Sequence, residues 1–241
     1  MLKLTNISKT YGNNKVKAVD NISLEVATGQ ILGFIGPNGA GKTTTMKMIT
    51  GVLSPDAGTI AINGHDLATN PLAAKQSFGF VPDSPDMFLR LKGMEYLNFM
   101  GDMYQVEAAQ RKEKIASMAE IFEMTGALSG RIQSYSHGMR QKIIIMGALL
   151  HDPALWILDE PLTGLDPRSS FQLKEMMKAH AQTGHSVLFS THMLEVAEKL
   201  CDKIALINKG KIIFQGELEA LKAQHNQLSL EEIFMEVTAN A

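Results

Sequence analysis

Residues 30–43 have the sequence QILGFIGPNGAGKT, and this stretch decides the fold. Its first part, Gln30–Gly36, is a short apolar run typical of a fully buried strand. The next part, GPNGAGKT at residues 36–43, matches the pattern G-x-x-x-x-G-K followed by Ser or Thr. Glycines let such a loop turn tightly, so that consecutive backbone N–H groups point at one anion. Residues 44–53, TTMKMITGVL, then have helical spacing and stop at a glycine. The stretch therefore predicts a strand, a phosphate-binding loop and a helix.

The chemistry of this loop depends on its last two residues. Lys42 would reach the β- and γ-phosphates of a nucleotide, and the Thr43 hydroxyl would bind Mg²⁺. The helix that follows would add the positive end of its dipole to the same anion. A glycine-rich turn without a ligand is the alternative, and the strand before it and the helix after it argue against that alternative.

An acidic pair, Asp159-Glu160, lies at the end of the run LWILDE, and Asp159 comes 117 residues after Lys42. A carboxylate at the C-terminal end of a buried strand lies where open α/β sheets bind ligands. Asp159 would hold Mg²⁺, and Glu160 would polarise the attacking water as general base. Taken alone, the pair could equally be a strand end that turns into solvent. Together with the glycine loop, it indicates nucleotide hydrolysis.

The rest of the chain alternates strand and helix patterns. The first sixty or so residues alternate in strand fashion and turn at Asn63-Gly64. From about residue 87 to residue 129, apolar residues recur three and four apart, which predicts amphipathic helices. Buried-strand runs at 154–160 and 185–192 are each followed by a helical segment, which predicts βαβ units and a parallel sheet. We expect an α/β core with an antiparallel β region and a helical insert.

Composition narrows the class of protein. The chain has 241 residues, 45% of them hydrophobic, enough for one large domain or a main domain with a smaller one inserted. The chain has a net charge of −2. Proteins that hold nucleic acid mainly through its phosphates usually carry an excess of basic residues, so we expect no nucleic-acid partner. The single cysteine, Cys201, favours a reducing cytosol. We expect neither a signal peptide at the start nor a membrane span, since the apolar runs are far shorter than about 20 residues.

The order and spacing of these and further motifs resemble the ATP-binding subunit of an ABC transporter, nearly from end to end. LTGLDP, at 162–167, resembles the D-loop with Asp166 as its acidic member. His192 resembles the switch histidine, which contacts the γ-phosphate and orients the catalytic water. Tyr11 resembles the aromatic residue that stacks on adenine. The nucleotide-binding residues that the resemblance implies are Tyr11, Gly36, Pro37, Asn38, Gly39, Ala40, Gly41, Lys42, Thr43 and Thr44.

The family fold implied by this resemblance is a P-loop ATPase core with a mostly parallel sheet, an antiparallel β subdomain and an inserted helical subdomain. The whole chain would be one ATP-binding domain. Its expected parts are the core at 1–86 and 134–216, the helical subdomain at 87–133, and a short helical tail at 217–241.

SYSHGMRQK, at residues 134–142, resembles the family signature. Taken alone, Ser136-His137 suggests a nucleophile and its base, but a serine hydrolase also needs an orienting acid and an oxyanion hole that we cannot place in the sequence. The resemblance implies instead that Ser136, His137 and Gly138 contact nucleotide held by a second chain. The Ser136 hydroxyl and the Gly138 backbone, at a helix N-terminus, would bond the γ-phosphate.

Two positions depart from the family pattern. The family usually has a glutamine where this chain has Asp83, in GFVPDSPDMF. A carboxylate can also bind Mg²⁺, so the implied metal ligands are Thr43, Asp159 and Asp83, but it adds negative charge beside the γ-phosphate. A Gly-Gly pair is common in the signature, whereas this chain has His137-Gly138, so a side chain stands where there is often none.

The resemblance implies an Mg²⁺-dependent ATPase that powers transport of an unknown substrate. Two copies, or this chain and a homologous ATPase subunit, would pack head to tail with ATP between them. Separate membrane permease subunits would hold them at the cytoplasmic side of the cell membrane. The roughly 25 residues after Gly216 are too few for the regulatory domain of sugar importers, so we expect export. The alternatives are a soluble ABC-type ATPase acting on DNA or ribosomes, and a nucleotide-binding regulator without turnover.

Overall fold

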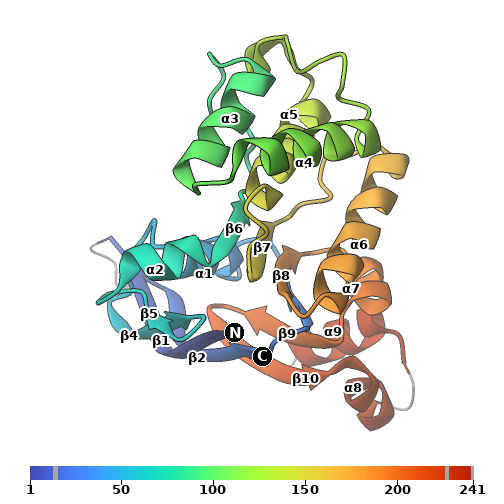
Figure 1. Cartoon of the computed structure of the whole chain (residues 1–241). Coiled ribbons are helices and arrows are strands. Elements are labelled where there is room, and N and C mark those ends of the chain that lie inside the picture. Colours follow the sequence, from blue (N-terminus) through green and yellow to red (C-terminus); the bar gives the residue numbers. More distant parts are fainter. Residues whose placement is uncertain (13–15, 226–227, 240–241) are drawn as a thin grey trace.

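The structure, a computed structural model, describes residues 1–12, 16–225 and 228–239. Its central sheet has six strands in the order β10-β9-β3-β8-β7-β6 (Figure 1). The strands are β3 (Ile31–Ile35), β6 (Phe78–Val81), β7 (Leu155–Asp159), β8 (Ser186–Thr191), β9 (Lys203–Asn208) and β10 (Lys211–Glu217). Among the described strands of this sheet, β9, β3, β8, β7 and β6 all run parallel to one another, and β10 is antiparallel to β9. The expected mostly parallel α/β sheet is therefore confirmed.

A second, antiparallel sheet lies below helix α1 in Figure 1. Its order is β2-β1-β4-β5, formed by β1 (Leu2–Tyr11), β2 (Val16–Val26), β4 (Ala57–Ile62) and β5 (His65–Asp66). Asn63 and Gly64 join the last two strands with φ of 51° and 80°. Two consecutive positive φ values are what a two-residue hairpin turn requires, so the predicted turn falls where the sequence placed it.

Helices cover the central sheet and extend beyond it. They are α1 (Lys42–Ile49), α2 (Pro71–Gln76), α3 (Gly93–Met103), α4 (Ala108–Ile121), α5 (His137–Leu149), α6 (Pro167–Gln182), α7 (Leu194–Leu200), α8 (Leu218–Gln224) and α9 (Leu230–Ala239). A single 3₁₀ turn, Ile132–Ser134, precedes α5. Helices α3 and α4 lie within the expected insert and stand away from the sheets in Figure 1. The domain limits themselves stay a prediction.

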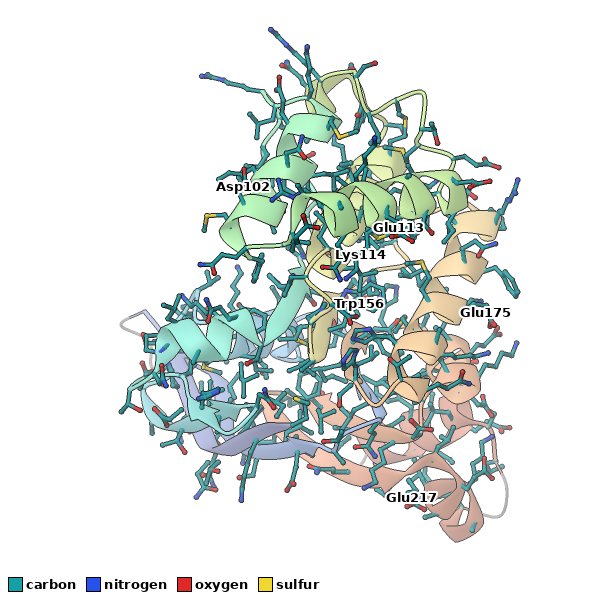
Figure 2. The ribbon with its side chains drawn as sticks, in the orientation of Figure 1. Asp102, Glu113, Lys114, Trp156, Glu175 and Glu217 are labelled. Atoms are coloured by element: carbon teal, nitrogen blue, oxygen red, sulfur yellow. The ribbon has the colours of Figure 1, made fainter. Side chains whose placement is uncertain are left out.

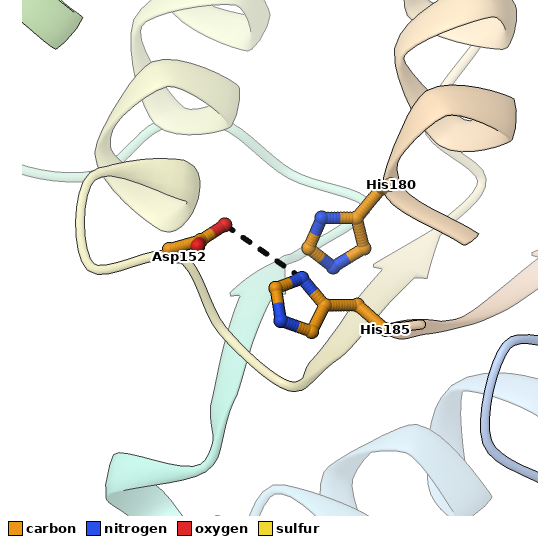
Figure 3. Close-up of side chains that lie close together, drawn as sticks. All are labelled: Asp152, His180 and His185. Atoms are coloured by element: carbon orange, nitrogen blue, oxygen red, sulfur yellow. Dashed lines mark ion pairs between the residues drawn. The ribbon is translucent and has the colours of Figure 1, made fainter. Parts of the chain in front are cut away.

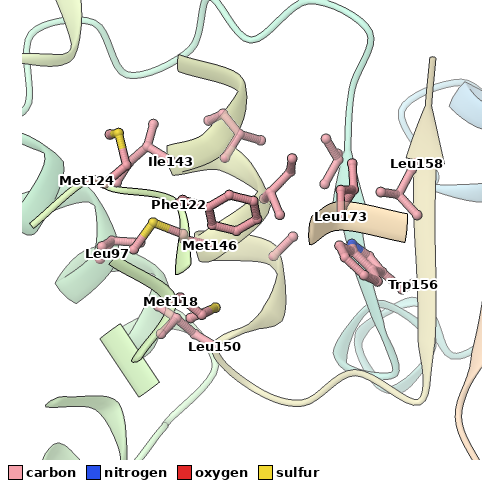
Figure 4. Close-up of a cluster of buried hydrophobic side chains, with 14 of the residues drawn as sticks. Leu97, Met118, Phe122, Met124, Ile143, Met146, Leu150, Trp156, Leu158 and Leu173 are labelled. Carbon is pink, nitrogen blue, oxygen red and sulfur yellow. The ribbon is translucent and has the colours of Figure 1, made fainter. Parts of the chain in front are cut away.

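Strand β7 shows how the core holds the functional strand ends in place. Leu155 and Ile157 face α1 and the antiparallel sheet, whereas Trp156 and Leu158 face α5 and α6. Figure 4 shows Trp156 and Leu158 beside Leu173 of α6. These four apolar side chains of β7 are fully buried, and burial of each contributes roughly 1.5–3 kcal/mol of stability through the hydrophobic effect. Packing on both faces therefore fixes where β7 ends, at Asp159.

Polar and charged side chains cover the outside. Asp102, Glu113 and Glu175 lie on exposed helix faces in Figure 2, while Trp156 lies inside. None of the helices in the described ranges is both long enough and apolar enough to cross a membrane.

Candidate nucleotide-binding site

The loop between β3 and α1 can be built only with glycine at key positions. A Cβ on Gly36 would lie 2.3 Å from the Ile207 carbonyl oxygen, and one on Gly41 would lie 2.5 Å from the Ala18 carbonyl oxygen. Gly39 and Gly41 have φ of 80° and 111°, which side chains strongly disfavour. The loop thus turns tightly against β9 and β2 and leads directly into the N-terminus of α1.

Lys42, the first residue of α1, lies with its ammonium group folded back inside the loop. It is 6% exposed, and its Nζ donates to the Gly36 and Pro37 carbonyl oxygens at 2.6 and 3.2 Å. The same Nζ lies 3.4 Å from Glu160 Oε1. A buried ammonium needs partners that compensate its desolvation. A bound phosphate would supply a stronger partner than the two neutral carbonyl groups.

Asp159, at the end of β7, is a buried carboxylate held between two strands. Ser190 of β8 is its register partner and donates its hydroxyl to Asp159 Oδ1 at 2.5 Å. Burial raises the pKa of Asp159; hydrogen bonds from Ser190 and Thr43 oppose this rise, and the nearby Asp83 and Glu160 carboxylates add to it. Three carboxylates and a threonine hydroxyl therefore converge, and a hard divalent cation fits this oxygen donor set.

Glu160, directly after β7, links the loop lysine to the end of the neighbouring strand. Its backbone is held at φ 49° by an N–H bond to the Ser190 hydroxyl at 3.0 Å. One carboxylate oxygen faces Lys42, and the other, Oε2, lies 2.9 Å from His192 Nδ1. His192 follows β8 and has an exposed ring. The arrangement gives Glu160 a fixed orientation with one side open to the pocket.

Lys42, Glu160 and His192 line one pocket of about 470 Å³. It is formed by loop residues 37–39 and 41–44 together with Ala18, Asp83, Glu160, Thr163 and His192. Gly36 and Ala40 are buried behind the loop. The structure therefore brings together the predicted loop, the general-base candidate, the switch-histidine candidate and Asp83, which follows β6.

Besides the buried Asp159, Gly36 and Ala40, five predicted site residues lie outside this pocket: Tyr11, Ser136, His137, Gly138 and Asp166. Tyr11 ends β1 with 46% of its surface exposed, so its ring face is accessible for stacking. Ser136 is the N-cap of α5, and its hydroxyl accepts a hydrogen bond from the Met139 N–H at 3.3 Å. It is exposed to solvent. The signature therefore lies at a helix N-terminus, as the sequence predicts.

His137 packs against the turn that follows the acidic pair. A Cβ added to Gly164 would lie 2.3 Å from His137 Cδ2, and one added to Gly138 would lie 2.9 Å from the Gly164 carbonyl oxygen. The histidine ring thus covers the bare backbone of Gly164, in LTGLDP. The side chain at position 137 thus connects the start of α5 with the turn at residues 162–167.

This contact can be tested with Gly164→Ala. Alanine at φ 77° costs about 1 kcal/mol of stability from backbone strain, and the new methyl group also displaces His137. Gly184→Ala is the matched control, because Gly184 has φ 89° and no atom within 4 Å of its added Cβ. Urea unfolding should show a larger loss for Gly164→Ala than for Gly184→Ala. Adding His137→Gly should remove the difference; an unchanged difference would refute the contact.

Asp166 caps helix α6 within its own chain. Its carboxylate accepts hydrogen bonds from the Ser169 N–H and hydroxyl at 2.9 and 2.6 Å, and Lys142 Nζ of α5 lies 3.1 Å away. The Ser169 hydroxyl bond is the main cause that lowers the pKa of Asp166. Asp166 is therefore ionised and fixes the start of α6 against α5.

Sequence inspection missed three residues of the site. Ala18 and Thr163 line the pocket, and Ser190 orients both Asp159 and Glu160. Ser190 could have been found, because a serine near the end of a buried strand, next to a carboxylate-bearing strand, has few other partners. Ala18 carries no such signal, since it contributes mainly backbone.

The fold and the pocket define a P-loop nucleoside triphosphatase: a glycine loop between β3 and α1, an Asp-Glu pair at the end of β7 in the same sheet, and the loop lysine beside the glutamate. Residues 19–163 match the ABC transporter family. The chain belongs to that family and is an ATP-binding subunit of this class of transporter.

Three similar proteins support this assignment. The chain is 35% identical to the ABC transporter ATP-binding protein NatA of Bacillus subtilis, over 98% of this chain and 97% of that protein. It is 35% identical to the Nod factor export ATP-binding protein I of Cupriavidus metallidurans, over 90% of this chain and 71% of that protein. A solved ATP-binding subunit of an ABC transporter superposes with a TM-score of 0.93 at 32% identity, covering 99% of both chains.

Proposed function

We propose that this subunit hydrolyses ATP with Glu160 as general base and drives export through separate membrane subunits. The observation that carries the proposal is the position of the Glu160 carboxylate, with one oxygen 3.4 Å from Lys42 and the other 2.9 Å from His192. Lys42 would hold the β- and γ-phosphates, which places the γ-phosphate and its attacking water beside Glu160. His192 would orient that water and the carboxylate.

Mg²⁺ fits the oxygen donors of Thr43 and Asp83, which line the pocket, together with that of the buried Asp159. The Thr43 hydroxyl and the Asp159 and Asp83 carboxylates would hold it, directly or through water. Bound between these groups and the phosphates, the ion would neutralise charge on the transferring phosphoryl group. It would also relieve the repulsion that Asp83 adds in place of a neutral glutamine. We therefore propose that Asp83 makes the site depend on a divalent cation more strongly than a glutamine would.

The position of the signature supports a dimer. Ser136 and Gly138 lie at the N-terminus of α5, outside the pocket that contains Lys42 and Glu160. An exposed N-terminus of a 13-residue helix is suited to bind an anion held by another molecule. We propose that two copies, or this chain and a homologous subunit, pack head to tail and that each signature completes the other's site. ATP binding closes this dimer, and hydrolysis opens it.

The substitution Ser136→Ala tests the proposed dimer with the purified chain alone. It should weaken ATP-driven dimerisation of the chain about tenfold, since one hydrogen bond to a charged phosphate is lost. ATP affinity of the monomer should stay within about twofold, since Ser136 is not part of the pocket. Sedimentation velocity and equilibrium nucleotide binding measure the two quantities. Ser134→Ala is the control, because the Ser134 hydroxyl donates to the local Arg131 carbonyl, its one hydrogen bond to another described residue. A large loss of monomer affinity in Ser136→Ala would refute the assignment.

The helical subdomain offers a surface for the membrane subunits. Besides Ile121, its exposed large apolar residues are Met87, Phe88, Met94, Phe99 and Met103. The Phe88 ring lies 5.7 Å from the Phe99 ring, so the segment after Asp83 and helix α3 share one apolar patch. Such exposed apolar patches are typical of protein contact sites. We propose that a permease subunit docks here and holds the chain at the cytoplasmic side of the membrane.

Export is the direction that we propose. The similarity to a protein named for Nod factor export supports it. Purification of the untagged chain's complex in mild detergent tests this partner assignment: an integral membrane protein should co-purify, and Phe99→Glu should release it. Co-purification with ribosomes or DNA instead would support the alternative of a soluble ATPase with a non-transport partner.

A further inference from the structure

A cluster of metal-ligating side chains lies at the end of the central sheet opposite the nucleotide pocket. Asp152 follows α5 in a turn closed by its N–H bond to the Leu149 carbonyl at 3.1 Å. His180 lies in the last turn of α6, and His185 directly precedes β8. Figure 3 shows the two imidazole rings next to each other, with the Asp152 carboxylate directed toward His185.

The ligand atoms of these residues converge. One atom from each residue lies within 4.8 Å of the other two, and His185 Nδ1 is 3.7 Å from Asp152 Oδ1. The ring centroids of His180 and His185 are 4.7 Å apart. Around a tetrahedral Zn²⁺ with bonds of about 2.0–2.2 Å, ligand atoms lie roughly 3.3–3.6 Å apart. Small side-chain rotations therefore suffice to place all three ligands around one ion.

Two buried nitrogen atoms of this cluster lack a hydrogen-bond partner within the described residues. They are His180 Nε2 and His185 Nδ1. His180 is 8% exposed, so its unpartnered Nε2 is shielded from water. A neutral imidazole has one nitrogen with a lone pair, which either accepts a hydrogen bond or binds a metal ion. Two buried ring nitrogens without hydrogen bonds, next to a carboxylate, are therefore free to bind an ion.

We propose that Asp152, His180 and His185 bind a divalent transition-metal ion of the zinc class. Two imidazole nitrogens and one carboxylate oxygen select Zn²⁺, Co²⁺, Ni²⁺ or Cu²⁺ over Mg²⁺, which prefers oxygen ligands only. The Asp152 side chain is 62% exposed, so an ion can enter from solvent and keep a water molecule as its fourth ligand. This site is separate from the proposed Mg²⁺–ATP site and does not depend on it.

The ion would connect three elements that also lead to the nucleotide site. It would bind them at the ends far from that site. Asp152 precedes β7, which ends at Asp159; His185 precedes β8, which is followed by His192. His180 lies near the end of α6, whose N-cap is Asp166. A bound ion would therefore fix β7, β8 and α6 to one another at the amino edge of the sheet.

Calorimetric titration of the tag-free full chain with ZnCl₂, without nucleotide and in excess Mg²⁺, tests the proposal. We expect saturable binding of one Zn²⁺ per chain. His185→Gln and Asp152→Asn, which change partly or largely exposed side chains, should each weaken binding by about tenfold or more. Zinc should also raise the melting temperature of the wild-type chain and have a smaller effect on the two variants.

His192→Ala is the matched control, because His192 and Glu160 form the other histidine–carboxylate contact described above. Zinc binding should survive this substitution. The proposal is overturned if no saturable binding occurs, if both site variants bind zinc as tightly as the wild type, or if His192→Ala alone abolishes binding. Circular dichroism confirms that each variant is folded, so that loss of binding reports on the ligands.

Discussion

Replacing Glu160 by glutamine is expected to reduce ATP turnover by about a hundredfold or more, the range that a general base contributes. Glutamine keeps the size of the side chain and can still contact His192 Nδ1, but it cannot accept a proton from water. ATP binding should persist and even tighten, because the negative charge beside the γ-phosphate is gone. Steady-state phosphate release and equilibrium ATP binding measure the two effects separately.

Glu175→Gln is the control for this substitution. Glu175 lies on the exposed face of α6 and pairs with Lys178, three residues along the same helix. Its turnover should equal that of the wild-type chain. If Glu160→Gln retained turnover within about threefold of the wild type, Glu160 would not be the general base, and the proposed chemistry would be wrong.

Replacing Lys42 by alanine is expected to weaken ATP binding by about thirtyfold or more, equivalent to roughly 2 kcal/mol or more. The Lys42 ammonium is already desolvated and lies inside the loop, so a bound phosphate gains a full charge contact without further burial. The substitution also leaves Glu160 without its cationic neighbour. Fluorescence titration with a labelled ATP analogue measures the change.

Lys47→Ala is the matched control, since Lys47 lies on the same helix with an exposed side chain. Its nucleotide affinity should be unchanged. Equal losses in both variants would mean that the effect comes from the stability of α1 and not from contact with phosphate.

The phosphate loop and the strand ends could be predicted from the sequence because each depends on local rules. Gly36 and Gly41 are needed where backbone atoms approach within contact distance, and the apolar run before Asp159 is buried on both faces. The mostly parallel sheet follows from the alternation of strands and helices. These features are encoded within a few neighbouring residues.

The remaining features depend on contacts between distant residues. His137 meets Gly164 only because α5 and the turn after β7 pack together, and nothing in SYSHGMRQK indicates this. The cluster of Asp152, His180 and His185 has no spacing typical of a metal motif, since three separate elements bring its members together. Lys142 likewise reaches Asp166 across two helices. Tertiary structure alone creates these contacts.

The central claim is that ATP is hydrolysed at a site shared between two chains. Mixing Glu160→Gln with Ser136→Ala, at a protein concentration where each variant alone turns over little ATP, tests it most directly. In a mixed dimer one site contains both substitutions, whereas the other combines the intact Glu160 of one chain with the intact Ser136 of its partner. Equal amounts should therefore recover about a quarter of the wild-type ATPase rate by random pairing. A mixture no more active than the mean of the two variants measured separately would contradict the shared site.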